Sequence, residues 1–225
     1  MNKTTYLLIE NYMTLCMEDS AHDKEHIYRV LYTALDIAQT EPNVNCDVLI
    51  SACLLHDIGR KEQFENPDLC HAKVGADKAY HFLIDNEFDE TFAEHVKCCI
   101  ETHRFRKNNP PQSIEAKILF DADKLDASGV IGIARTLMYK GQVSEPLYSL
   151  LPNGQVSSGE NDETPSFFQE YKYKLENIYS NFFTRRGTEL AKERQQSAIR
   201  FYNDIFNEAN FSYINGQNAL DKFIQ

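Results

Sequence analysis

The sequence lacks the features that mark membrane, secreted and disulfide-linked proteins. No stretch of about 18 apolar residues occurs in the 225-residue chain, and the N-terminal Met-Asn-Lys-Thr-Thr-Tyr has no apolar signal core. The six cysteines form no Cys-x-x-Cys pair and no regular framework, so they are predicted to be free thiols in a reducing compartment. Together these absences predict a cytoplasmic protein that does not enter a membrane.

Positive charge is also scarce. Lysine and arginine total 23 against 34 aspartate and glutamate residues, which gives a formal net charge of -11. Domains that bind nucleic-acid polymers usually carry a basic stripe that releases counterions from the phosphate backbone. The charge therefore argues against a polymeric nucleic-acid partner. Bound divalent cations would offset part of the acidity.

Internal repeats, low-complexity tracts and strand-like alternation of useful length are absent from the sequence. Helical periodicity recurs instead, so the predicted fold is all-α. We expect one domain over residues 1–225, with a core at about 20–140, a long loop at about 141–165 and C-terminal helices at about 166–209. The tail at 212–225 receives no assignment.

Apolar spacing locates the helices before the loop. The first, over residues 4–18, has Leu7, Leu8, Tyr12 and Leu15 as its expected apolar face. Ser20 is a plausible N-cap for the next, which continues to Ala38. Residues 61–68 read as a polar loop, and two further helices are expected over 71–84 and 91–103.

The central stretch of the chain is Ser51–Arg60, in which an apolar run ends in the pair His56-Asp57. The run predicts a helix that is buried on nearly all sides. A buried, unpaired carboxylate costs several kcal/mol, so Asp57 must be paired, hydrogen-bonded or bound to a metal ion. Gly59 follows at the position expected for a helix C-cap.

Other polar residues are candidates for the same interior site. His26 lies at the edge of an apolar helical stripe, and Asp123 shares a helix face with apolar residues and so needs a buried partner. Asp121 shares a face with lysines, which could satisfy it, as could water. His71 and His103 could point to the site or to solvent. A lone histidine is more often a hydrogen-bonded core residue than a ligand, and Asp123 alone could form a structural ion pair or cap.

Taken together, His26, His56, Asp57 and Asp123 form a set of two histidines and two aspartates on three predicted helices. Nitrogen and carboxylate ligands without thiolates suit manganese, iron, cobalt, nickel, zinc or magnesium. Such an ion could lower the pKa of a bound water and polarise a phosphoryl oxygen. The set therefore indicates hydrolytic chemistry.

In order and type, these four residues resemble the H…HD…D pattern of the HD-domain phosphohydrolase superfamily. The surrounding motifs are similar to those of small bacterial stand-alone HD proteins, some of which are described as metal-dependent nucleotide pyrophosphohydrolases. The matching motifs are His22-Asp23-x-x-His26-Ile27-x-Arg29-Val30, Leu55-His56-Asp57-Ile58-Gly59, Asp121-Ala122-Asp123-Lys124-Leu125-Asp126-Ala127 with Gly129 and Ile131-Gly132-Ile133-Ala134-Arg135, and Thr184-x-x-Gly187 with Leu190-Ala191 and Arg194.

The resemblance covers most of residues 20–209 and implies an HD-domain helical bundle with additional C-terminal helices. It also implies metal-ligand roles for the four residues and a phosphate-holding role for Lys124. The chain departs from the pattern at Thr33, where relatives often carry Asn, and at Arg104-Phe105-Arg106, where they tend to have Ser-Phe-Ser. These arginines could alter substrate choice. No Gly-Tyr-Pro segment is present, which argues against a cyclic-dinucleotide phosphodiesterase.

The predicted function is hydrolysis of a small phosphate ester or anhydride by a metal-dependent nucleotide pyrophosphohydrolase or nucleotidase. Lys124 and Arg29 are candidates for neutralising phosphate charge, and His103 or His71 for donating a proton or binding a second ion. Asp23 could cap its helix or bond to a liganding histidine. Two alternatives are a non-catalytic nucleotide-sensing module and a structural metal site. The long loop and C-terminal helices offer a surface for a homodimer.

Overall fold

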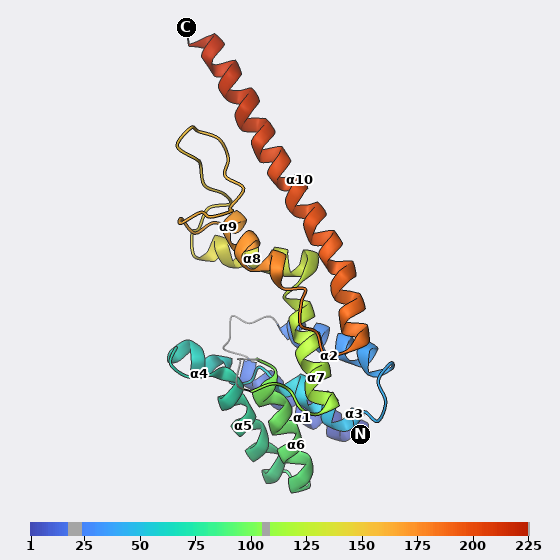
Figure 1. Cartoon of the computed structure of the whole chain (residues 1–225). Coiled ribbons are helices and arrows are strands. Elements are labelled where there is room, and N and C mark those ends of the chain that lie inside the picture. The colour runs from blue at the N-terminus through green and yellow to red at the C-terminus, as the bar shows by residue number, and fades with distance from the viewer. Residues whose placement is uncertain (18–23, 105–108, 225) are drawn as a thin grey trace. The chain divides into compact units, whose positions relative to one another are not determined.

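The computed structural model describes residues 1–17, 24–104 and 109–224, and it is all-helical, as predicted (Figure 1). Within these residues the structure has ten α-helices, one short 3-10 helix and an isolated β-bridge between Leu150 and Val156. The expected cap at Ser20, the role of Asp23 and the departures at Phe105 and Arg106 lie outside the described residues.

The helices form two compact units. The first contains residues 1–126 and 182–187, and the second contains residues 127–181 and 188–225. That the two units act as one domain stays a prediction. The helices of the first unit are α1 (Lys3–Met17), α2 (Lys24–Ala38), α3 (Cys46–Leu55), α4 (Arg60–Glu65), α5 (His71–Asp85), α6 (Glu90–Thr102) and α7 (Ile114–Asp126).

Helix α3 occupies the centre of the first unit, where it contacts α1, α2, α5, α6 and α7. The side chain of Asn45 caps its start by accepting hydrogen bonds from the backbone amides of Asp47 and Val48. From Ser51 to Gly59 every residue is buried. The end of α3 therefore delivers the His-Asp pair into the interior, as the apolar run predicts.

Gly59 is required for close packing, and its predicted position as a helix C-cap is wrong. His56 is the C-cap of α3, whereas Gly59 is the N-cap of α4 with a φ of -94°. A Cβ atom on Gly59 would lie 2.4 Å from the backbone oxygen of His71 and 2.6 Å from the backbone nitrogen of Gly75. The glycine thus lets α5 begin directly against the turn that follows the His-Asp pair.

Three other segments differ from the prediction. The polar loop expected at 61–68 is largely helical, because α4 occupies Arg60–Glu65. The helix expected at 166–181 is shorter, with α9 over Phe167–Tyr173 and a 3-10 turn over Leu175–Asn177. The last helix, α10, begins at Arg185 and continues to Phe223, so most of the unassigned tail is helical.

Helix α1 buries a different face from the predicted one. Its three leucines are exposed, Leu15 by 66%, and Tyr12 is only half-buried. The residues that enter the core are Ile9, Met13 and Met17, which follow one another at intervals of one turn. Apolar residues occur on both faces, so periodicity alone could not select the inward one.

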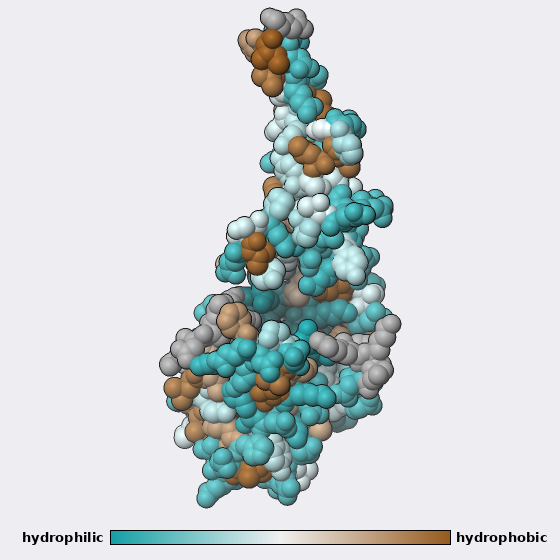
Figure 2. All heavy atoms as spheres, turned by 90° about the vertical axis from the view of Figure 1, so that its left-hand side faces the viewer, coloured by the Kyte–Doolittle hydropathy of each residue, from teal (hydrophilic) through white to brown (hydrophobic). Residues whose placement is uncertain are grey.

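The second unit is built from α8 (Gly129–Gln142), α9, the 3-10 turn and most of α10, with an irregular segment between α8 and α9 as predicted. The rings of Tyr171 and Tyr202 stack at 4.1 Å in its core. Apolar side chains also gather at the C-terminal end of α10, where Phe223 is 88% exposed (Figure 2). The expected homodimer stays a prediction. Among the described helices, none has the length and apolar character needed to cross a membrane.

Candidate metal centre

Four histidines of the first unit surround the carboxylate of Asp57. The Oδ2 atom lies 3.5 Å from Nε2 of His26 and 3.7 Å from Nε2 of His56. The Oδ1 atom lies 3.6 Å from Nε2 of His71 and 3.7 Å from Nε2 of His103. All five side chains are buried. Asp57 therefore joins two histidine pairs, one through each of its oxygens.

The first cluster consists of His26, His56 and Asp123, together with Oδ2 of Asp57. Oδ1 of Asp123 lies 3.4 Å from Nε2 of His26 and 3.9 Å from Nε2 of His56. The two Nε2 atoms are 3.3 Å apart. The structure thus brings together all four predicted ligands from α2, the end of α3 and α7. The ligand atoms of His26, His56 and Asp123 lie within 4.8 Å of one another, a spacing that could hold one ion, and Oδ2 of Asp57 lies beside both histidines.

The second cluster consists of His71, His103 and Oδ1 of Asp57, which also have a spacing that could hold an ion. The Nε2 atoms of the two histidines are 3.3 Å apart. His71 begins α5 and His103 is the C-cap of α6. The sequence left open whether these histidines face the site or water, and both face the site.

Each of the four imidazoles also makes a hydrogen bond through its outer nitrogen, Nδ1. Because the nearest partner of Nδ1 is an oxygen acceptor each time, Nδ1 carries the proton, and in the neutral ring the Nε2 lone pair points into a cluster. This is the tautomer that a metal ion requires. The acceptors are Asp126 Oδ2 for His26 at 2.8 Å, Cys53 O for His56 at 2.7 Å, Gln63 Oε1 for His71 at 2.7 Å, and Ile100 O for His103 at 2.6 Å.

The field in the first cluster is strongly negative. Burial by itself would lower the pKa of His26, but its hydrogen-bonded carboxylates, Asp123 first, outweigh burial and raise the pKa to about 11. In the metal-free protein His26 is therefore an imidazolium at neutral pH. A position where carboxylates hold a proton so firmly also stabilises a metal cation.

The field differs at the second cluster. Burial, followed by the nearby Arg60, lowers the pKa of His71 to about 3, even though Asp57 opposes the shift. In the first cluster, burial likewise lowers the pKa of His56 to about 4. Both imidazoles are therefore neutral at physiological pH and can offer Nε2 as a ligand or a proton acceptor.

Arg29, a candidate for binding phosphate, contacts a carboxylate behind the first cluster. Its Nε donates to Oδ1 of Asp126 at 2.6 Å, and its Nη2 donates to Oδ2 at 3.1 Å. Asp126 in turn accepts from His26. In this structure Arg29 thus orients the residue that fixes the tautomer of a candidate ligand, and a contact with substrate phosphate stays a prediction.

Lys124, the other candidate, is half-buried beside two aromatic rings. Its Nζ lies 5.4 Å from the ring centre of Phe120 and 4.8 Å from that of Phe182. Burial lowers the pKa of the ammonium. The two rings attract the cation and restrict where its side chain can point. Its contact with phosphate also stays a prediction.

The burial of two aspartates on α7 is the reverse of the expectation. Asp121 is fully buried, whereas the Asp123 side chain is 24% exposed. Asp121 accepts hydrogen bonds from the backbone amides of Phe183 at 3.0 Å and Thr184 at 2.7 Å, and from the Thr184 hydroxyl at 2.6 Å. These donors lie about 60 residues away in the sequence, so helical spacing could not have shown them.

Several residues of the centre were missed as site residues. Asp126 lies three residues after Asp123 and shares its helix face, so the sequence held a signal for it. Arg60, whose Nε lies 2.9 Å from Oδ1 of Asp57, and Gln63 had no such signal. Both belong to α4, in the segment that was expected to be a loop.

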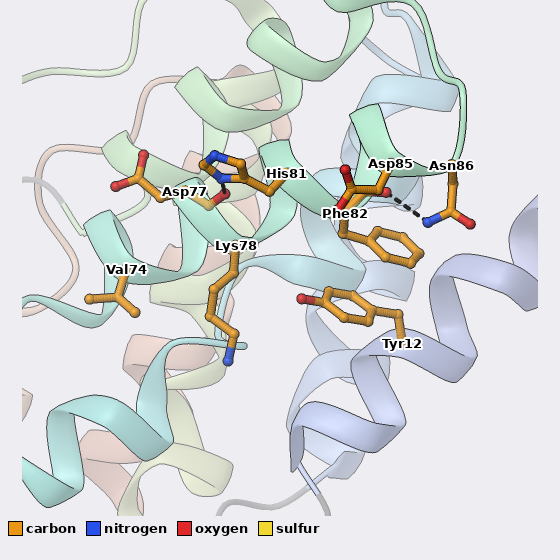
Figure 3. Close-up of a pocket in the computed structure, with 8 residues that line it drawn as sticks. All are labelled: Tyr12, Val74, Asp77, Lys78, His81, Phe82, Asp85 and Asn86. Atoms are coloured by element: carbon orange, nitrogen blue, oxygen red, sulfur yellow. Dashed lines mark hydrogen bonds between the residues drawn. The ribbon is translucent and has the colours of Figure 1, made fainter.

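A cavity of about 540 Å³ lies elsewhere in the first unit, between α1 and α5, and contains none of the cluster residues (Figure 3). The rings of Tyr12 and Phe82 stack at 3.9 Å in its wall. Lys78 lines the same cavity, and its Nζ donates to the backbone oxygen of Ile58 at 2.9 Å and to Glu62 at 2.6 Å. Lys78 thereby supports the turn that follows Asp57.

Comparison with known proteins identifies the fold that carries this centre. Residues 24–128, which include both clusters, match the family model of the HD domain. This part of the chain is an HD domain. It is 28% identical over 192 residues to the uncharacterized protein YpgQ of Bacillus subtilis strain 168, with 84% of each chain covered.

Two solved structures resemble this HD-domain protein over most of its length. One is an HD-superfamily hydrolase from Bacillus thuringiensis, with a TM-score of 0.71, 25% identity, and coverage of 92% of this chain and 97% of the other. The second is Bacillus subtilis YpgQ in complex with ADP, with a TM-score of 0.69, 25% identity, and coverage of 89% and 97%. These likenesses confirm the predicted all-helical HD fold and agree with a hydrolase.

Proposed function

We propose that this HD-domain protein is a metal-dependent phosphohydrolase that acts on a nucleotide, as a nucleoside triphosphate pyrophosphohydrolase or a nucleotidase. One observation carries the proposal. Four histidines direct Nε2 toward the carboxylate of Asp57, and each fixes Nδ1 on an acceptor outside the clusters. Such a convergence of ring nitrogens and carboxylates in a buried position is costly unless a cation binds there, and in the metal-free protein the proton on His26 partly fills that role.

The donor set fits a divalent ion. In the first cluster, Nε2 of His26 and His56 would hold the ion together with Oδ2 of Asp57 and Oδ1 of Asp123. Nitrogen and oxygen donors without thiolates suit manganese, iron, cobalt, nickel, zinc or magnesium. When bound, the ion supplies Lewis acidity toward a phosphoryl oxygen and toward the attacking water.

The residues of the chain would supply binding and proton transfer. Lys124 would neutralise charge that develops on the phosphoryl oxygens. The oxygen of water would form a bond to phosphorus while the bond from phosphorus to the leaving oxygen breaks. Nε2 of His103 would accept the proton that the water loses and give it to the leaving oxygen. His103 suits this role because Nδ1 stays bonded to Ile100, which leaves Nε2 to carry the transferred proton.

The choice of a nucleotide rests on a relative. YpgQ, which is 25% identical to this chain over 89% of its length, has been crystallised with ADP. A purine nucleoside diphosphate can therefore bind a protein of this fold. We extend that binding to this chain as part of the proposal.

The test is a screen for product release. Protein stripped of metal and reloaded with manganese, cobalt, nickel, zinc or magnesium would be incubated with nucleoside mono-, di- and triphosphates. Pyrophosphate released from a triphosphate would identify a pyrophosphohydrolase, and orthophosphate released from a monophosphate would identify a nucleotidase. Tight binding of the ion with every nucleotide left intact would overturn the proposal in favour of nucleotide sensing or a structural ion.

A further inference from the structure

The two clusters share the carboxylate of Asp57, and among the described residues a guanidinium bonds to one of its two oxygens. Nε of Arg60 donates to Oδ1 of Asp57 at 2.9 Å, and this is the oxygen that faces His71 and His103. Arg60 is the first residue of α4, so its backbone is fixed next to the turn that bears Asp57. The Arg60 side chain is 28% exposed and that of Asp57 is 2% exposed. The cation thus reaches the centre from its solvent side.

Negative groups predominate beside the first cluster, and positive groups predominate beside the second. At the first cluster, Oδ2 of Asp57 is joined by the carboxylate of Asp123, which lies 3.4 Å from Nε2 of His26. Behind the ring, Asp126 contacts Nδ1 of His26 and is paired with Arg29. At the second cluster, Oδ1 of Asp57 is the one carboxylate oxygen that the described residues place within 4 Å of His71 and His103. This oxygen already accepts a hydrogen bond from the guanidinium of Arg60.

Arg104 brings a second positive charge close to the second cluster. Nη1 of Arg104 lies 3.4 Å from Nδ1 of His71. A divalent ion at the second cluster would therefore face the guanidinium of Arg60, with that of Arg104 behind the His71 ring, whereas an ion at the first cluster faces the carboxylates of Asp57 and Asp123. Repulsion between a guanidinium and a divalent ion a few ångströms apart in a partly buried site is large enough to decide which cluster fills.

We propose that Arg60 sets the number of metal ions, because its guanidinium takes the place of a second ion at Oδ1 of Asp57. This inference rests on the proposed function in that it takes the first cluster to be the resident metal site. The chain then binds one ion at the first cluster. His71 and His103 stay free of metal, and their Nε2 atoms face Oδ1 of Asp57.

The arrangement of ligands makes Arg60 the deciding residue. His71, His103 and Oδ1 of Asp57 already have the spacing of a metal site, and both histidines have the required tautomer. What opposes an ion there is the positive charge. Removal of the guanidinium while the stem is kept should therefore allow a second ion to bind.

The test counts ions rather than turnover. Metal-stripped wild type would be titrated with manganese, with bound ion measured by equilibrium dialysis and by electron paramagnetic resonance. We expect one ion per chain, with any second ion bound at least about 100-fold more weakly. Arg60→Met should bind two ions, with the spin coupling of ions that lie about 4 Å apart. Arg60→Lys, which keeps the charge, should bind one.

Each contrary outcome has a separate meaning. Two ions of similar affinity in the wild type, or one ion in a folded Arg60→Met protein, would overturn the role of Arg60 while the metal proposal stands. Absence of any ion from the wild type would overturn the proposed function as well. Thermal melting establishes that each variant is folded. If Arg60→Met does not fold, Arg60→Gln, which also removes the charge, should bind two ions, and a single ion in folded Arg60→Gln would overturn the role of Arg60. The extra ion of Arg60→Met should disappear in Arg60→Met combined with His71→Gln.

Discussion

Oδ2 of Asp126 lies 2.8 Å from Nδ1 of His26, while Nε2 of the same ring faces Asp57 and Asp123. One imidazole thus links a carboxylate outside the centre to the ligands inside it. A carboxylate in this position fixes the orientation of the ring and raises its basicity as a ligand. Asp126 is held in turn by the guanidinium of Arg29.

Asp126→Asn should therefore weaken metal binding without removing a ligand. We expect a loss of about 10–100-fold in affinity, the usual effect of replacing a residue that supports a metal-bound histidine. The matched control is Asp36→Asn, which removes a carboxylate from the surface of α2, where Asp36 pairs with Arg186. Equal metal affinities in the two variants would contradict the role of Asp126.

Metal binding should release one proton from His26. The pKa of this residue in the metal-free protein is raised to about 11, while that of His56 is lowered to about 4, so at neutral pH only the former must lose a proton to become a ligand. Because one proton must leave when the ion binds, metal affinity should increase with pH, by about tenfold per pH unit from about pH 5 to about pH 9. Calorimetry in two buffers of different ionisation enthalpy measures the proton. A pH-independent affinity would show that His26 is not a ligand.

Gly59→Ala should disturb the centre, although it adds only a methyl group. The new Cβ would lie 2.4 Å from the backbone oxygen of His71, so α5 must move away from the turn that bears Asp57. We expect a loss of about 1–3 kcal/mol in stability, with weaker metal binding. Gly141→Ala is the control, since no atom lies within 4 Å of its added Cβ and alanine favours a helix by up to about 1 kcal/mol. Equal melting temperatures for the two variants would refute this account of Gly59.

Asp121→Leu should destabilise the first unit, because it leaves two buried donors of Thr184 and the part-buried amide of Phe183 without their acceptor. The expected cost is about 3 kcal/mol. Thr184→Val removes a hydroxyl that donates to Asp121 and accepts from the backbone amide of Gly187 at 3.0 Å, and it should cost about 1–2 kcal/mol. Urea denaturation measures both. A larger loss for Thr184→Val than for Asp121→Leu would show that Asp121 is not the anchor.

Local patterns were enough to predict the parts of the centre that lie on long, periodic helices. The apolar run before His56 has one structural solution, a buried helix, and its end must bring the polar pair inside. His26 and Asp123 could be recognised because each lies beside an apolar stripe. For these residues the helix face alone decides whether the side chain points inward.

Contacts between residues far apart in the sequence explain what the sequence left open or missed. His71 and His103 lie on helices whose polar faces could meet either solvent or the site, and only the packing of α5 and α6 around α3 decides between them. Asp121 is buried by donors that approach from the start of α10, and Arg60 reaches Asp57 only because a short helix replaces the expected loop. Sequence spacing carries no information about what lies opposite a helix.

The most direct test of the central claim is nucleotide hydrolysis by metal-stripped protein, followed as manganese is added and bound ion is counted in the same samples. The account predicts no release of phosphate or pyrophosphate without metal, and turnover that rises in proportion to occupancy of the first cluster and reaches its maximum at one ion per chain. His56→Ala should lose both the ion and the turnover. Full turnover in the stripped protein, or in a His56→Ala protein that binds no ion, would contradict it.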